Sequence, residues 1–245
     1  TIAQEDIARI VDEHRFDFFA AGHGREQGAG SRERGAGSRC WGDAAMAAQF
    51  QALLARSRQD PPPAGPPPAE LKPAAEKAEL KIAWVLETHV HADHLSGAPY
   101  IKLKTGAKVG IGEHVRDVQR IFRPVFNALD VSGDGSEFDH LFRDGERFKI
   151  GNMDVEVLFT PGHTLASIAY LVGDAAFIHD TIFMPDGGTA RADFPGGDAR
   201  QLYRTVRRLM KLPAQSRVFL CHDSKAPNRD EYVWETTMLA ERTGN

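Results

Sequence analysis

From residue 81 onward, short apolar runs alternate with amphipathic stretches, which is the pattern of a layered α/β domain. Compact apolar or alternating runs predict strands over residues 81–87, 109–111, 147–150, 153–159, 168–172, 175–178 and 218–221. Helical spacing predicts helices over 95–104, 113–122 and 199–212, and a last helix from Asp230. Two hairpins are expected about Gly151-Asn152 and Gly173-Asp174. In the helix over 95–104, we expect Leu103 to pack inward.

Residues 1–75 do not continue this pattern. A short amphipathic stretch is followed by a tandem glycine- and arginine-rich repeat over 25–38, and prolines dominate 61–68. Such composition buries little apolar surface and favours an extended linker. We therefore expect a low-complexity leader over 1–75 and a folded domain over 76–245.

Composition excludes several classes of function. The chain has 245 residues, a formal net charge of −4 and a sequence pI near 6.2, so it lacks the basic footprint of a nucleic-acid-binding protein. No run of about eighteen apolar residues predicts a membrane span. The first residues lack a secretory pattern, and two cysteines do not suggest a disulfide framework. We expect a cytoplasmic protein.

The segment Thr88-His-Val-His-Ala-Asp-His94 follows the first predicted strand and holds three imidazoles and a carboxylate. Such a cluster does not pack into a core, because each buried nitrogen needs a partner and protonated imidazoles repel one another. A metal ion satisfies all of them. Alternation points His89 and His91 the same way, and Asp93-His94 adds two more donors, so the spacing suits one or two adjacent ions.

Three later strands also end in residues that can bind metals. His163 lies on the turn Thr160-Pro-Gly-His-Thr164, Asp180 follows the strand at 175–178, and His222 follows the strand at 218–221. The ends of strands at one edge of a sheet commonly gather active-site residues in α/β folds. The sequence therefore predicts one metal centre built from four strand ends.

The order His-x-His-x-Asp-His, Pro-Gly-His, Asp and a late His resembles the metallo-β-lactamase superfamily over about residues 80–240. Segments 87–96, 188–198, 221–223 and 234–237 resemble in particular the persulfide dioxygenases of the ETHE1 type and the bacterial β-lactamase hydrolase-like group. The resemblance implies an α/β fold, the metallo-β-lactamase αββα sandwich, with residues 76–245 as the catalytic domain. Its members begin with paired strands that 1–80 do not predict, so we expect an atypical, incomplete N-terminal sheet edge.

The resemblance also implies an activity, namely oxidation of glutathione persulfide by O₂ to sulfite and glutathione, with one Fe²⁺ per chain. The iron ligands carried over are His89, His163 and Asp180. The outer shell carried over consists of His91, Asp93, His94 and His222. Arg191 would pair with a substrate carboxylate, or with Asp193 or Asp198 to hold its own loop. Dimers are common among such enzymes, so a homodimer is compatible with the resemblance.

Four positions carry expectations of their own. His179 stands where the family usually has glycine, and we expect a strand residue that points away from the metal. Ala192 replaces a common cysteine, and Ser224 replaces a common tyrosine, which would alter a substrate contact. Cys221 is expected to be a buried residue at a strand end. His179, Cys221 and Ser224 are thus candidate modulators of the site.

Two alternative functions stay open. The same residues can form a dizinc centre, with His89, His91 and His163 on one Zn²⁺ and Asp180 as the bridge. Asp93, His94 and His222 would then hold the second ion, as in thioester or lactone hydrolases of the glyoxalase II type. The resemblance favours the dioxygenase, because glyoxalase II relatives carry a helical domain after the last histidine and this sequence ends soon after His222. The second alternative is a metal-binding protein without turnover.

Overall fold

The computed structural model describes residues 75–76, 79–90, 96–125, 127–223 and 225–245. Its strands form one three-stranded sheet, in the order β1-β2-β3, and one six-stranded sheet, in the order β4-β5-β6-β7-β8-β9. The strands are β1 (Trp84–Leu86), β2 (Lys108–Gly112), β3 (His140–Phe142), β4 (Arg147–Ile150), β5 (Met153–Phe159), β6 (Ile168–Val172), β7 (Ala175–Phe177), β8 (Arg217–Phe219) and β9 (Glu235–Thr237). The helices are α4 (Ala98–Thr105), α5 (Val115–Val125), α6 (Ala199–Leu209) and α7 (Met238–Gly244).

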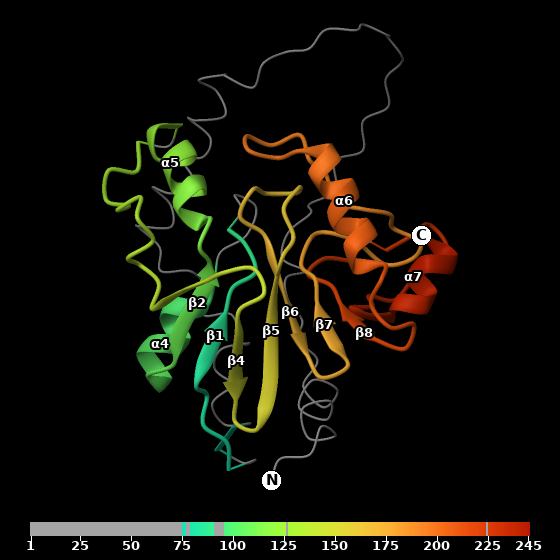
Figure 1. Cartoon of the computed structure of the whole chain (residues 1–245), viewed down its shortest axis with the longest axis horizontal. Coiled ribbons are helices and arrows are strands. Elements are labelled where there is room, and N and C mark those ends of the chain that lie inside the picture. Colours follow the sequence, from blue (N-terminus) through green and yellow to red (C-terminus); the bar gives the residue numbers. More distant parts are fainter. Residues whose placement is uncertain (1–74, 77–78, 91–95, 126, 224) are drawn as a thin grey trace, which may run out of the picture.

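The two sheets lie face to face between two layers of helices. Figure 1 shows α4 and α5 outside the smaller sheet, and α6 and α7 outside the larger one. The smaller sheet is parallel, whereas the larger one is antiparallel except for the parallel pair of β7 and β8. This arrangement confirms the predicted αββα sandwich. The expectation for the N-terminal sheet edge and for the leader over 1–75 lies almost wholly outside the described residues.

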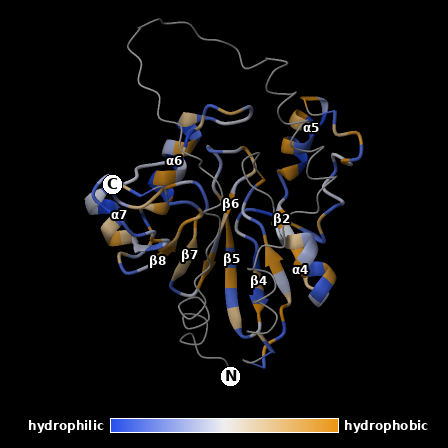
Figure 2. Ribbon diagram, turned by 180° about the vertical axis from the view of Figure 1, so that it is seen from behind, coloured by the Kyte–Doolittle hydropathy of each residue, from blue (hydrophilic) through white to orange (hydrophobic). Residues whose placement is uncertain are grey.

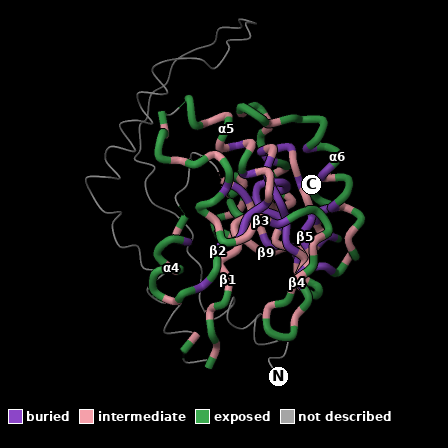
Figure 3. The backbone as a smooth tube through the Cα atoms, turned by 60° about the vertical axis from the view of Figure 1, so that its left-hand side comes forward, coloured by how far each residue is buried: buried purple, intermediate pink, exposed green. Residues whose placement is uncertain are grey.

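Alternation along the central strands supplies both cores. On β5, Val155 and Val157 pack against Phe142 between the two sheets, while Leu158 faces the layer of α6 and α7. Successive side chains of a strand point to opposite faces, so a seven-residue strand serves two cores. Figure 2 shows apolar residues along β5 and β6, and Figure 3 shows that the buried backbone gathers at the centre of the molecule.

Local sequence features fix where the helices begin and end. Pro99 stands in the first turn of α4, and Gly106 ends that helix in the left-handed conformation with φ of 72°. Asp198 caps α6 by accepting hydrogen bonds from the backbone N–H groups of Arg200 and Gln201. The Asp198 cap makes α6 begin directly after the segment that carries Arg191.

The predicted hairpins are confirmed, but other boundaries are corrected. The first strand covers Trp84–Leu86, and the structure adds a parallel strand, β3, where the sequence pattern predicts none. The last helix begins at Met238 and not near Asp230, because Glu235–Thr237 pairs with β8. Leu103 is 80% exposed, so its predicted inward packing is wrong. Among the described residues, no helix has the length and apolar character needed to cross a membrane.

Candidate metal centre

The site lies where β1, β5, β7 and β8 have ended and their following loops converge. His89 follows β1, His163 lies on the turn after β5, Asp180 follows β7, and His222 follows β8. The turn before His163 requires glycine. Gly162 has φ of 142°, and a Cβ atom there would lie 2.3 Å from Cα of Leu202 in α6. This close approach of helix and turn therefore sets the position of the His163 backbone.

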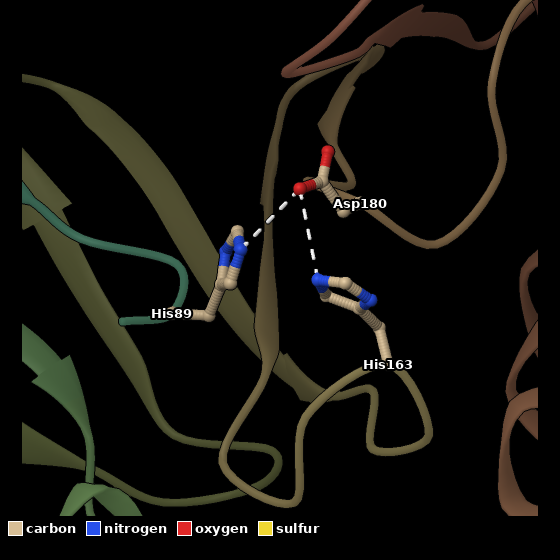
Figure 4. Close-up of side chains that lie close together, drawn as sticks. All are labelled: His89, His163 and Asp180. Carbon is tan, nitrogen blue, oxygen red and sulfur yellow. Dashed lines mark ion pairs between the residues drawn. The ribbon is translucent and has the colours of Figure 1, made fainter. Parts of the chain in front are cut away.

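Two histidines face one carboxylate in the interior. Nε2 of His89 lies 3.4 Å, and Nε2 of His163 lies 3.8 Å, from Oδ2 of Asp180 (Figure 4). All three residues are buried, and one ligand atom from each lies within 4.8 Å of the others. The structure thus brings together the three residues carried over as iron ligands.

His222 approaches the same carboxylate from the solvent side. Its Nε2 atom lies 3.3 Å from Oδ2 of Asp180, and its side chain is 42% exposed. Burial raises the pKa of the Asp180 carboxyl, but hydrogen bonds from His222 and His89 outweigh this effect and hold the pKa well below its ordinary value. Asp180 is therefore an anion throughout the physiological pH range.

The ring of His163 is oriented by the backbone. Nδ1 of His163 donates a hydrogen bond to the carbonyl oxygen of Arg191 at 2.8 Å, which leaves the lone pair of Nε2 directed to Asp180. Phe194 contacts the same ring edge-on, with 5.6 Å between ring centroids. A hydrogen bond of this kind fixes the tautomer and the orientation of a metal-binding histidine. A carbonyl partner is invisible in the sequence.

A family model described as the metallo-beta-lactamase superfamily matches residues 44–222. The chain belongs to this superfamily. A "Beta-lactamase hydrolase-like protein" of Xylella fastidiosa is 49% identical over 170 residues, which are 69% of this chain and 39% of that protein. "Glyoxylase B2" of Dictyostelium discoideum is 45% identical over 170 residues, which are 68% of this chain and 58% of that protein. Both matches thus take in less than two thirds of the relative.

A solved structure of the superfamily is also similar. The crystal structure of ETHE1 from Myxococcus xanthus matches with a TM-score of 0.55 at 30% sequence identity, over 72% of this chain and 67% of that chain. These comparisons support the metallo-β-lactamase fold. They name a hydrolase-like protein, a glyoxylase and ETHE1, and therefore leave the reaction of this chain to the chemistry of its site.

Members of the metallo-β-lactamase superfamily bind metal ions, and the buried triad fits such an ion. Oδ1 of Asp180 is buried and has no hydrogen-bond partner among the described residues, which is costly for an anion without a cation beside it. Two imidazole nitrogens and a carboxylate suit first-row divalent metals, iron and zinc included. The donor set does not distinguish between these two metals.

His179 directly precedes Asp180 in the chain, and the expectation that it is a strand residue is wrong. Strand β7 ends at Phe177, and His179 has φ of 46°, in the left-handed region that favours glycine. Its ring is buried 5.3 Å from the ring of His89, and its Nε2 atom lies within hydrogen-bond distance, 2.8 Å, of the hydroxyl oxygens of both Thr160 and Thr181. Burial and the neighbouring His89 lower its pKa well below the ordinary value. His179 is therefore a neutral packing partner of a proposed ligand.

Arg191 is paired within its own loop. Its guanidinium donates to both carboxylate oxygens of Asp193, at 3.0 and 2.8 Å, and lies over the ring of Phe194 at 4.9 Å. Of the two loop partners suggested by the sequence, the structure shows Asp193. Asp198 instead caps α6. The Arg191 side chain stays 63% exposed, so a substrate carboxylate can reach it.

The structure describes only one of the remaining predicted residues. His91, Asp93, His94 and Ser224 lie outside the described residues, so their roles stay predictions. Cys221 is not a buried strand-end residue, because β8 ends at Phe219 and Cys221 is exposed two residues later. The exposure belongs to the residue as a whole, whereas its thiol group is desolvated; this desolvation and the nearby charge of Asp180 raise the pKa of the thiol to about 12, so a thiolate is disfavoured there.

Proposed function

We propose that this chain is an iron-dependent dioxygenase that oxidises glutathione persulfide with O₂ to glutathione and sulfite. The observation that carries the proposal is the buried group of His89, His163 and Asp180. Two histidines and one carboxylate on one face of a metal are the ligand set of non-haem ferrous oxygenases. The similarity to the ETHE1 structure of Myxococcus xanthus supports the same assignment.

The reaction balances as GSSH + O₂ + H₂O → GSH + SO₃²⁻ + 2H⁺. The persulfide as a whole loses four electrons, as its outer sulfur becomes sulfite and its inner sulfur becomes the thiol, and O₂ gains them. A ferrous ion held by the triad would leave positions open for both reactants and would supply the one-electron chemistry. The chain itself holds Asp180 as an anion, fixes the ring of His163, and places His222 at the solvent side, where its imidazole can exchange protons with water.

Arg191 is the residue we propose for binding glutathione. It is exposed and lies on the segment whose carbonyl orients His163, so a substrate held there is close to the metal centre. A guanidinium binds a carboxylate through two parallel hydrogen bonds. Because Asp193 occupies that fork, the substrate carboxylate has to compete with it.

A dizinc thioester or lactone hydrolase is the second candidate. It is favoured by the approach of His222 to Oδ2 of Asp180, at 3.3 Å, beside the 3.4 Å contact from His89, because a shared carboxylate can bridge two ions. The similarity to "Glyoxylase B2" of Dictyostelium discoideum also supports it. Under this candidate the bridging carboxylate is Asp180.

Parallel assays on metal-free protein reloaded with either metal test the two candidates. With Fe²⁺ we expect O₂ uptake and stoichiometric sulfite when glutathione persulfide is added, and no cleavage of a glutathione thioester. Asp180→Asn should abolish uptake, whereas Asp154→Asn, on an exposed hairpin, should not. Thioester cleavage by the zinc form, without uptake by the iron form, would replace the dioxygenase with the hydrolase. If neither activity is found, the protein binds metal without turning over these substrates.

A further inference from the structure

Arg229 joins two segments that lead to the metal centre. Its guanidinium donates to Asp186 at 2.8 and 3.0 Å, and to both carboxylate oxygens of Asp223, with the Nη2–Oδ1 distance at 2.7 Å. It also donates to the carbonyl oxygen of Glu231 at 2.8 Å. The Arg229 side chain is 20% exposed, and that of Asp223 is 9% exposed. Bidentate pairs at this depth are geometrically specific, unlike ordinary surface ion pairs.

Each carboxylate is adjacent to a part of the site. Asp223 directly follows His222, and its Oδ2 atom also accepts the backbone N–H of Val233 at 2.7 Å. Asp186 lies on the segment that runs from Asp180 to the carbonyl of Arg191. One side chain therefore ties the segment that carries His222 to the segment that begins at the proposed carboxylate ligand.

His222 lies in a loop between two strands. Strand β8 ends at Phe219 and β9 begins at Glu235, so no described helix or strand contains His222. Its ring is half-exposed, whereas His89 and His163 are enclosed by the core. The anchoring of Asp223, the next residue, therefore helps to set the distance between His222 and Asp180.

We propose that Arg229 is a positioning residue that holds His222 against Asp180 by bridging Asp223 and Asp186. The inference rests on the proposed metal centre, but not on the identity of the reaction. Loss of the bridge frees the 221–223 segment. The His222 ring then no longer stays beside the Asp180 carboxylate, so the proposed metal ligand loses this contact. Changes to such outer partners typically weaken metal binding about 10- to 100-fold.

Co²⁺ titration of the metal-free protein tests this without any turnover. Affinity is measured by competition with a chelator, and coordination by the visible absorption of the bound Co²⁺. For Arg229→Gln we expect about tenfold weaker binding and an altered spectrum. Arg229→Lys should be intermediate, because an ammonium lacks the planar fork that serves two carboxylates.

Arg217→Lys is the matched control. Arg217 also makes a bidentate pair, with Glu235 at 2.5 and 2.9 Å, and its side chain is 26% exposed, but it joins β8 to β9 instead of the two site segments. We expect Arg217→Lys to bind Co²⁺ like the original protein, with the same spectrum. If Arg229 had a purely structural role, its lysine variant and Arg217→Lys would have the same Co²⁺ affinity and spectrum.

A double-mutant cycle isolates the route through His222. If Arg229 acts by positioning that histidine, Arg229→Gln should have no further effect on Co²⁺ affinity in a His222→Ala protein. Equal effects in both backgrounds, or unchanged affinity and spectrum in folded Arg229 variants, would overturn the proposal. If Arg229→Gln does not fold, Asp186→Asn removes one arm of the bridge, and original affinity in that variant would overturn it too. Absence of O₂ uptake would count against the dioxygenase alone.

Discussion

Replacing Glu241 with glutamine should stabilise the protein at alkaline pH and have little effect at acidic pH. Glu241 lies in α7 with no exposed surface, and its Oε1 atom has no hydrogen-bond partner among the described residues. Its Oε2 atom accepts a hydrogen bond from the side chain of Asn245 at 3.0 Å. Desolvation, above all, raises the pKa of Glu241 from 4.5 to about 7, and the charge of Asp186 adds to the rise.

The sign and size of the effect follow from linkage. Between pH 4.5 and about 7 the folded protein binds more protons at Glu241 than the unfolded chain does, so stability falls as the pH rises through this window. A tenfold change in acid dissociation corresponds to about 1.4 kcal/mol, which sets a ceiling of about 3.5 kcal/mol for the full cost above pH 7. Because local relaxation of the folded structure recovers part of the cost of a buried charge, we expect about 1–2 kcal/mol.

Thermal unfolding of the metal-free protein at pH 5 and pH 8 measures this effect. Metal is removed because ligand binding to the folded state would mask the difference. Glu241→Gln should raise Tm by about 3–6 °C at pH 8 and by much less at pH 5. Asp154→Asn, at an exposed carboxylate paired with Lys149, should show no such dependence. A Gln variant no more stable than the original at pH 8, or equally stabilised at both pH values, would refute the reasoning.

Three further substitutions probe the site and its frame. Gly162→Ala should lower the free energy of unfolding by about 3 kcal/mol in urea titrations, because the new methyl group would meet the backbone of Leu202; an unchanged midpoint would contradict this. His179→Phe keeps a ring but leaves two threonine hydroxyls without their partner, so we expect a loss of about 1–3 kcal/mol, and a neutral outcome would count against the hydrogen bonds. Arg191→Ala should raise KM for glutathione persulfide about tenfold with little change in kcat, whereas Asp193→Asn should lower KM; the opposite split would remove Arg191 from substrate binding.

The sequence predicted those parts of the fold that depend on neighbouring residues. The hairpins β4–β5 and β6–β7 form about the expected turns, because alternating strands and a glycine-containing turn are local features. The sequence does not predict strand β3, because a strand of three residues is too short to show a repeating pattern of apolar positions. Its pairing with β2 is set by tertiary contacts. The sequence pattern also places the start of the last helix too early, because tertiary pairing decides where that helix begins. Glu235–Thr237 pairs with β8, and Thr237 caps the helix after it.

For the candidate site as well, the sequence predicts some residues and not others. The set of ligand-type residues could be found because they follow the ends of strands that the fold brings together, and the resemblance to the superfamily singled out His89, His163 and Asp180 among them. The partners that orient them could not be selected. The carbonyl of Arg191 has no side-chain identity, and the contacts of Arg229 join positions 43 and 6 residues away. Such pairings arise only once the sheets and loops are in place.

The most direct test of the central claim is the metal content of the purified protein, measured together with O₂ uptake on addition of glutathione persulfide. We predict about one iron per chain, with oxygen consumed and sulfite formed, and loss of both iron and oxygen uptake in His89→Ala. About two zinc ions per chain with no oxygen consumed would contradict it.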